Sequence, residues 1–278
     1  MTGLILAIVF SAAFSHMIRY GQHRKQNMLW VGPANYWTAT TLCLFFWVAA
    51  PHPEVSLAKG ALGLVAGVAL CSAYFFINSA IRVAGVGMTQ SMSRLSVALP
   101  VVASIVIWQE RPSLGQSIGL GLALVAIPLL TRGRGLVGSE RNIWKSFVLF
   151  GNFVTIGIVG VAMKSYSRAL SGGEPAFLTL MFLTAAIGTQ VVVSLRHSRP
   201  TLSDLLVGMA LGVTNVISNY GIIYALATLP GTVVFPTVSA AAILVTSVSA
   251  AIIWGERYTR IAILGMVIAV FALILINL

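Results

Sequence analysis

The sequence has few charged residues, and acidic residues are the scarcest of them. Charged side chains make up 8% of the 278 residues and hydrophobic ones 58%, whereas an ordinary soluble domain is about 25% charged. This composition argues against a water-soluble enzyme and predicts an integral membrane protein. A spanning helix takes about 20 apolar residues, so ten such helices would use roughly 200 residues and leave only short connections.

Several kinds of catalytic site are missing from the sequence. Two cysteines and four histidines have no metal-ligand spacing, and there is no phosphate-binding loop or Gly-x-Ser-x-Gly elbow. Cys43 and Cys71 both fall in apolar stretches, where an unpaired cysteine behaves as a small hydrophobic residue. We therefore expect no enzyme activity, no cofactor and no metal, and no energy coupling to ATP within this chain.

Basic residues outnumber acidic ones by 17 to 6, which gives a formal net charge of +11. They occur one to three at a time between apolar stretches, without the continuous basic face that nucleic-acid binding requires. Scattered basic residues of this kind orient membrane proteins. We therefore expect membrane lipids and a small-molecule solute as partners, and no nucleic acid.

Apolar runs bounded by charge, proline or glycine predict ten spans. We place them at about 2–21, 29–50, 59–81, 86–108, 114–131, 144–164, 175–195, 204–228, 231–254 and 259–277.

An internal repeat relates the two halves of the chain. The sequence Trp108-Gln109-Glu110-Arg111 recurs as Trp254-Gly255-Glu256-Arg257, at a spacing of 146 residues. The same shift aligns further identical residues without a gap: Met17 with Met163, Tyr20 with Tyr166, Ser72 with Ser218, Tyr74 with Tyr220, Ile77 with Ile223, Gly85 with Gly231, Ser93 with Ser239 and Gly119 with Gly265. We therefore predict two five-helix copies, 1–132 and 147–278, joined by a linker at 133–146.

Five spans per copy is an odd number, so the second copy must enter the bilayer from the side opposite to the first. The predicted fold is an all-α membrane protein of ten transmembrane helices arranged as two inverted five-helix repeats. Such folds usually place a binding site near the bilayer midplane between the repeats, and they work by alternating access.

Charge predicts the orientation in the membrane. The connections on one side carry twelve basic residues, and those on the other side carry four, with Arg94 set aside as intramembrane; the four are Lys59, Arg111, Lys164 and Arg168. The positive-inside rule then puts both termini outside the cytoplasm. The membrane type that we expect is the bacterial inner (plasma) membrane.

A family resemblance rests on the segment from Pro100 through Glu110-Arg111-Pro112 to Gly115-x-x-x-Gly119, and on its echo in the second half. With these motifs the chain resembles the drug/metabolite transporter superfamily, EamA type. The resemblance implies a ten-span carrier of amino acids, metabolites or drugs, more often an exporter than an importer. Two features depart from the family: its members usually have cytoplasmic termini, and Thr246 stands at the second-copy counterpart of Pro100.

Arg94 is the main candidate for solute binding. On a helix over 86–108 it would lie eight residues in, roughly 12 Å along the axis, inside a hydrocarbon core of about 30 Å. Facing lipid there would cost on the order of 3 kcal/mol, so we expect it to point into the bundle. It could anchor a carboxylate or phosphate, or it could snorkel to the nearer interface.

Other polar residues within the spans could shape the same site. Residues four apart share a helix face, which pairs Gln90 with Arg94, Tyr74 with Asn78, and Tyr220 with Tyr224. Asn219 and Asn152 are lower-ranked candidates, since an amide within a span can instead bond between helices. Asn215 belongs to a different face from Tyr224 and is expected to make such a bond.

No carboxylate is available within a span, because all six acids fall at span ends or in connections. The resemblance implies that the small multidrug resistance relatives exchange protons for cationic drugs through a buried glutamate, so its absence here favours an anionic or zwitterionic solute. His16 is the mid-span group that titrates near neutral pH. It could be a proton relay or a hydrogen-bonded contact between helices.

Three motifs have structural interpretations. The two Glu-Arg turns are expected to cap helices, and Trp108 and Trp254 to anchor at the interfaces. Small-residue stripes are expected at close helix contacts; they comprise Gly60, Gly63 and Gly67, Gly115 and Gly119, and Gly208 and Gly212.

The function expected from the sequence is secondary transport of a small organic solute, such as an amino acid or a carboxylate, by a monomer or homodimer. A non-transporting membrane subunit that scaffolds a partner or handles lipid-linked molecules is one alternative, and a passive facilitator is another.

Overall fold

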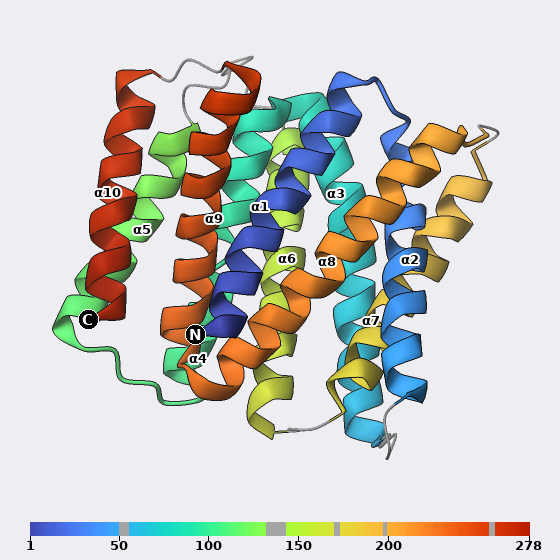
Figure 1. The fold of residues 1–278 in the computed structure, drawn as a ribbon. Helices are drawn as coiled ribbons and strands as arrows, with labels where there is room; N and C mark the ends of the chain where they lie inside the picture. The colour runs from blue at the N-terminus through green and yellow to red at the C-terminus, as the bar shows by residue number, and fades with distance from the viewer. Residues whose placement is uncertain (50–55, 132–142, 170–172, 197–198, 256–258) are drawn as a thin grey trace. The chain divides into compact units, whose positions relative to one another are not determined.

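The structure is a computed structural model, and it describes residues 1–49, 56–131, 143–169, 173–196, 199–255 and 259–278. The described residues form ten α-helices and no strand (Figure 1). The helices are α1 (Thr2–His23), α2 (Met28–Val48), α3 (Leu57–Leu95), α4 (Ala98–Val106), α5 (Leu114–Thr131), α6 (Ile143–Ala169), α7 (Glu174–Ser194), α8 (Leu202–Thr228), α9 (Gly231–Trp254) and α10 (Arg260–Asn277).

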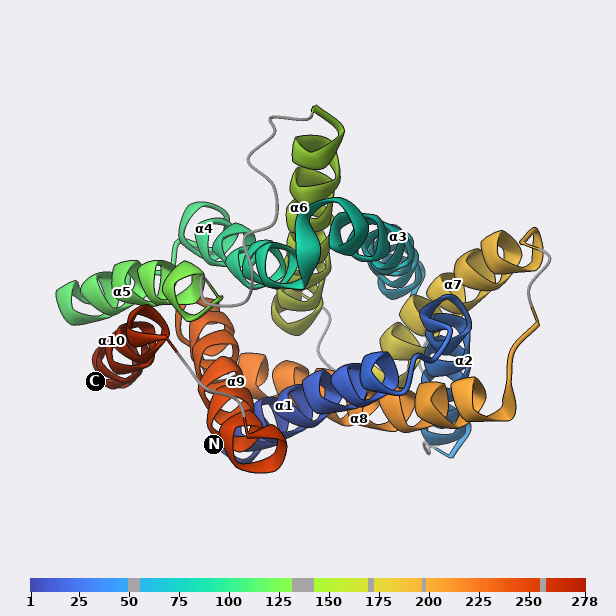
Figure 2. The same ribbon diagram turned by 90° about the horizontal axis from the view of Figure 1, so that it is seen from above.

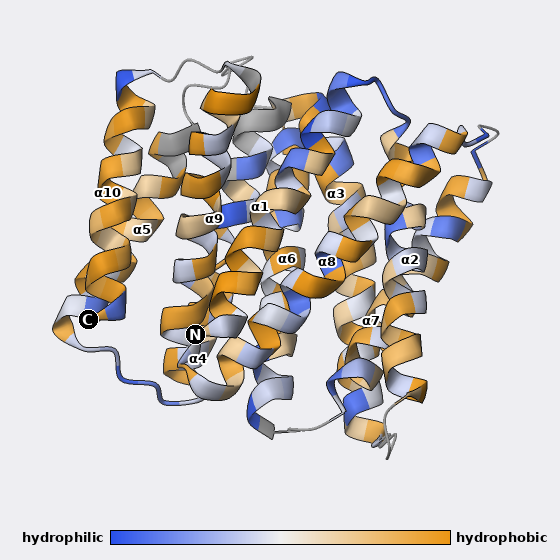
Figure 3. Ribbon diagram, in the orientation of Figure 1, coloured by the Kyte–Doolittle hydropathy of each residue, from blue (hydrophilic) through white to orange (hydrophobic). Residues whose placement is uncertain are grey.

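Within the described part of the chain, seven helices are long and apolar enough to cross a membrane, which confirms that this is an integral membrane protein. They are α1, the Leu57–Ala84 part of α3, and α6 to α10. Figure 3 shows apolar helix sides, whereas hydrophilic residues gather in connections such as the one between α4 and α5. The α2, α4 and α5 segments are not among the seven, so the count of ten spans stays a prediction.

The third and fourth predicted spans were placed wrongly. The expected break at 82–85 is absent, since α3 continues to Leu95 and a shorter α4 follows. The break lies near Ser96 because Pro100 has no N–H to donate to the Ser96 carbonyl. That carbonyl instead accepts the Leu99 N–H at 3.1 Å. No proline lies near 82–85 to interrupt the helix there.

The chain folds into two compact units. Unit 1 is Met1–Tyr74 with Ala162–Ala227, and unit 2 is Phe75–Val161 with Thr228–Leu278. Each unit therefore draws on both halves of the sequence, and α3 and α6 each contribute to both units.

Glycines bring the helices of unit 1 close together. A Cβ on Gly67 in α3 would lie 2.6 Å from the Met181 carbonyl oxygen of α7, and one on Gly212 in α8 would lie 2.6 Å from the Asn35 carbonyl oxygen of α2. Gly221 meets α1 in the same way, 2.6 Å from the Ala7 nitrogen. The predicted role of the small-residue stripes is confirmed here, and α2 also packs extensively on α7.

Unit 2 is built around the pairing of α5 with α10, which lie side by side in Figures 1 and 2. Gly119 of α5 faces Ala272 and Ile276 of α10. A core cluster of Ala126, Ile127, Ile243 and Ala269 ties α9 to the same pair of helices.

The predicted Glu-Arg cap of the first copy is confirmed, although the helix that it caps is distant in the sequence. The Glu110 carboxylate accepts the N–H groups of Gly231 and Thr232 at 3.1 and 3.0 Å, at the start of α9. The preceding residue, Gln109, has a left-handed backbone with φ 54°, and its repeat equivalent Gly255 has φ 63°. The Glu256-Arg257 turn lies outside the described residues.

Candidate functional site

The predicted solute-binding residues fall into two groups, one in each compact unit. Asn78, Gln90, Arg94 and Asn152 belong to unit 2, and His16, Tyr74, Asn219, Tyr220 and Tyr224 belong to unit 1.

Asn152 is the fully buried member of the unit 2 set. Its side chain on α6 is fully buried, and its Nδ2 donates to the Ser93 Oγ of α3 at 2.8 Å. Ser93 in turn donates to the Thr89 carbonyl at 3.0 Å. The Asn152 Oδ1 is buried and has no hydrogen-bond partner within the described part of the chain. The bond to Ser93 orients the amide and leaves this oxygen as an unsatisfied acceptor.

Arg94 follows Ser93 directly and is partly buried. The expected position eight residues into a helix over 86–108 was wrong, since Arg94 lies in the last turn of α3. A cation is favourable at that position because the helix dipole is negative at its C-terminus. Gln90 lies one turn earlier on α3, and Asn78 three further turns back, both partly buried. Ser93, Gln90 and Arg94 thus form a polar turn next to Asn152.

Tyr74 is held against α2. Its hydroxyl donates to the Met28 carbonyl, and its ring occupies the space that a side chain at position 32 would need, since a Cβ on Gly32 would lie 2.2 Å from the ring. The rings of Tyr74 and Tyr36 meet edge to face at 6.1 Å. These contacts fix the position of Tyr74.

The asparagines of α8 bond between and along helices. Asn215 donates to the Oδ1 of Asn35 on α2 at 3.2 Å, which is the interhelical bond expected of Asn215. Asn219 donates to the carbonyl and Oδ1 of Asn215 at 2.8 and 2.7 Å. Ser11 of α1 and Ser218 of α8 are 2.7 Å apart. These bonds form a polar seam between α1, α2 and α8, and a binding role for Asn219 stays a prediction.

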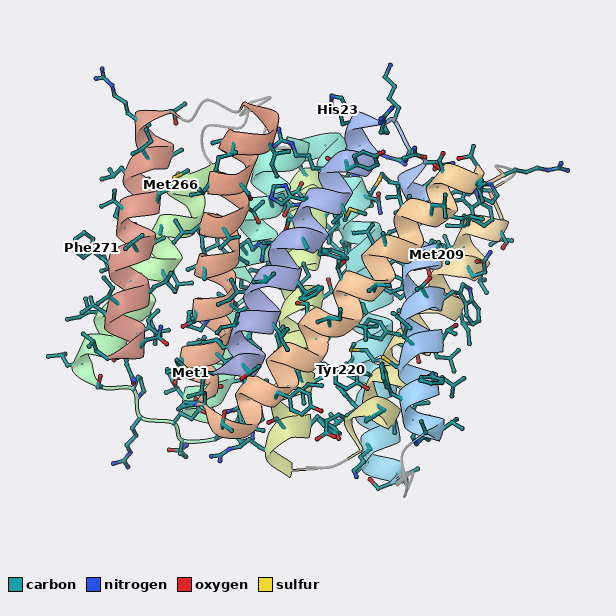
Figure 4. The ribbon with its side chains drawn as sticks, in the orientation of Figure 1. Met1, His23, Met209, Tyr220, Met266 and Phe271 are labelled. Carbon is teal, nitrogen blue, oxygen red and sulfur yellow. The ribbon has the colours of Figure 1, made fainter. Side chains whose placement is uncertain are left out.

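The remaining predicted residues of unit 1 differ in environment. Tyr220 lies on α8 (Figure 4), and its hydroxyl is buried without a hydrogen-bond partner among the described residues. Its ring packs against Phe46 and Tyr224 with centroids 6.2 Å apart in each case. Tyr224 is 55% exposed. His16 is partly buried on α1 and has partners within the protein.

Sequence reasoning missed Ser93 and Thr89, and it treated Lys59 and Lys164 as residues of connections although both are buried. The burial of the lysines could not be found from hydropathy, because a lysine at a helix end normally reaches water. Among the described residues, no group of three His, Cys, Asp or Glu side chains could hold a metal ion.

Comparisons with known proteins agree with this architecture. Residues 1–132 match the EamA-like transporter family. An uncharacterized protein of Haemophilus influenzae is 28% identical, over 98% of this chain and 96% of that protein. A solved crystal structure superimposes with a TM-score of 0.81 at 14% identity, over 98% of this chain and 94% of that one, which shows a shared fold.

Proposed function

We propose that this chain, whose residues 1–132 match the EamA-like transporter family, is a secondary transporter of that family. It exports a small organic solute, an amino acid or a carboxylate, across the bacterial inner membrane. Two inverted repeats alternate their access to a site near the bilayer midplane.

The backbone conformation just after α4 and just after α9 supports the prediction of two repeated copies. Gln109 and Gly255 are 146 residues apart and share a left-handed backbone. A left-handed glutamine is unfavourable, so its agreement with the glycine points to a common backbone template. The contacts of α2 with α7, α4 with α9 and α5 with α10 also join elements that the 146-residue shift makes equivalent.

The observation that best supports this function is the hydrogen bond from Asn152 to Ser93, in the turn that also holds Arg94. A guanidinium binds a carboxylate with two parallel hydrogen bonds, and the Asn152 Oδ1 can accept a proton from an amino or hydroxyl group. The bond to Ser93 fixes the Asn152 amide in advance, which reduces the ordering needed when a solute binds. A cation and an acceptor together suit a solute that carries a carboxylate and a donor.

The acidic residues that the structure describes lie at the starts of helices or cap them. Glu110 caps α9, Asp204 accepts the N–H groups of Asn27 and Thr201 at 2.9 Å each, and Glu174 lies in the first turn of α7. This placement favours an anionic or zwitterionic solute over a lipophilic cation, because a membrane-embedded cation site needs a compensating acid.

Flux into proteoliposomes tests the proposal. We expect Arg94→Ala to abolish amino-acid or carboxylate flux while its thermal unfolding stays near that of the wild type, and the exposed Arg82→Ala to leave flux unchanged. Flux in the Arg94 variant equal to that of the wild type would show that Arg94 does not anchor the solute. Flux that does not change when a gradient is imposed would indicate a passive facilitator. The absence of flux for every solute would favour a non-transporting membrane subunit.

A further inference from the structure

Unit 1 contains three buried hydrogen-bond donors for which the described residues supply no acceptor. They are the Tyr220 hydroxyl on α8, the Trp47 indole N–H on α2 and the Ser167 hydroxyl on α6. An indole N–H can only donate, and a buried donor left unsatisfied is unfavourable. Three such groups in one unit call for a ligand that accepts hydrogen bonds.

Phe46 and Cys43, which flank Trp47 on α2, lie near Tyr220. Phe46, the neighbour of Trp47, packs edge to face on the Tyr220 ring at 6.2 Å. Cys43 lies one turn before Trp47 on the same face of α2, and it is within electrostatic range of Tyr220. Trp47 therefore lies on the side of α2 that faces Tyr220.

Contacts also connect the end of α6 to Tyr220. Tyr166, the neighbour of Ser167, stacks on Phe177 of α7 with centroids 4.5 Å apart. Glu174, one turn before Phe177, is within electrostatic range of both Tyr166 and Tyr220. The end of α6, the start of α7 and the Tyr220 turn of α8 thus form one neighbourhood.

Two buried lysines belong to the same end of unit 1. Lys164 lies one turn before Ser167 on the same face of α6 and is 1% exposed, and Lys59 is 5% exposed in the first turn of α3. A Cβ on Gly63, one turn after Lys59, would lie 3.1 Å from the Phe177 carbonyl oxygen of α7. Lysine is almost never buried to this extent unless it is paired, and both have partners within the protein. Together with Glu174, the two lysines carry a formal net charge of +1 at this end of unit 1.

We infer that Trp47, Lys59, Lys164, Ser167 and Tyr220, the donor cluster, bind a small organic anion with an aromatic body. The three unsatisfied donors supply hydrogen bonds to its carboxylate, and the two ammonium groups supply favourable potential. The rings of Phe46 and Tyr220 offer faces on which an aromatic body can pack. The inference does not depend on the proposed transport function, and it uses residues of unit 1 alone.

A matched pair of probes tests the charge requirement. Benzoate and benzamide have the same shape, but benzoate alone carries a charge. We expect benzoate to bind the purified full-length protein saturably, measured by calorimetry and by thermal shift, and benzamide to bind at least tenfold more weakly. Equal binding of the two probes, or no binding of benzoate, would overturn the proposal.

Two variants locate the binding. Tyr220→Phe removes one hydroxyl, and losing a hydrogen bond to a charged group is expected to weaken benzoate binding about tenfold. Trp47→Phe should do the same, whereas the exposed Lys25→Met should have no effect. Benzoate affinity that Tyr220→Phe and Trp47→Phe leave unchanged would overturn the proposal, as would affinity that Arg94→Ala abolishes, because the anion would then bind in unit 2. Arg94→Ala flux tests the transport proposal separately.

Discussion

Glu110 fixes the first turn of α9 through the backbone N–H of Thr232, which lies 3.0 Å from its Oε2. Its other oxygen accepts the Gly231 N–H at 3.1 Å. Helices leave their first N–H groups without internal partners, and one carboxylate from the segment after α4 satisfies two of them. The connection between α4 and α5 therefore stabilises the first turn of α9.

Glu110→Ala is expected to destabilise the protein by about 1–2 kcal/mol, since it removes both a cap and a favourable charge at the helix start. The measurement is thermal unfolding of the purified protein in detergent. Glu110→Gln keeps one acceptor and should lose less, and the exposed Arg111→Ala should lose little. Equal melting temperatures for Glu110→Ala and Arg111→Ala would contradict the capping role.

Gln109→Gly is expected to stabilise the protein by about 1 kcal/mol, because glycine adopts a left-handed backbone without the penalty that a side chain carries there. The reciprocal change, Gly255→Gln, should destabilise by a similar amount. Chemical denaturation in detergent can compare both. The idea fails if Gln109→Gly lowers stability, for instance through loss of the 2.7 Å bond from the Gln109 Nε2 to the Val106 carbonyl.

Gly119→Ala is expected to separate α5 from α10. The added Cβ would lie 3.0 Å from both the Ala272 carbonyl oxygen and the Ile276 nitrogen, and backbone cannot give way as a flexible side chain does; overpacking of this kind costs about 1–3 kcal/mol. Gly121→Ala is the matched control, because nothing lies within 4 Å of its Cβ and alanine favours a helix by about 1 kcal/mol. Opposite shifts in melting temperature are expected, and shifts of the same sign would count against this packing.

Asn35 and Asn215 are expected to be coupled by about 0.6 kcal/mol, the average for polar pairs between membrane helices. A double-mutant cycle of Asn35→Ala and Asn215→Ala, followed by reversible unfolding in detergent, measures this term directly. Additive single effects would show that the 3.2 Å contact contributes nothing, and would leave the asparagines available for another role.

The helical, membrane-embedded character of the protein and its family resemblance followed from the sequence and are confirmed. Apolar runs identify helices because the bilayer requires every backbone group to bond internally. Leu229-Pro230 marked the break before α9 correctly, whereas Arg82 to Gly85 did not break α3. A charge and a glycine weaken a helix, but neither removes a donor or clashes with the preceding turn as proline does.

The site was harder to predict than the helices. Arg94 and Asn152 were identified because polar groups are rare within apolar runs, yet the bond from Asn152 to Ser93 depends on how α6 meets α3. Tyr74 and Tyr220 align in the repeat, but Tyr74 donates to a carbonyl, whereas Tyr220 has no acceptor among the described residues. Sequence equivalence predicts position in the fold, while hydrogen-bond partners depend on the neighbouring helix. The roles of the predicted site residues stay predictions.

The interruption at Ser96 has a mechanical consequence. The Val97 N–H bonds to the Arg94 carbonyl at 3.3 Å and the Leu99 N–H to the Ser96 carbonyl at 3.1 Å, so two three-residue loops replace the regular ladder. Swinging α4 about this joint would strain those two loops and the packing of α4 on α9, whereas the rows of helix hydrogen bonds on either side would remain closed. Arg94 sits at the pivot, so a bend there would re-aim its guanidinium without unwinding either helix.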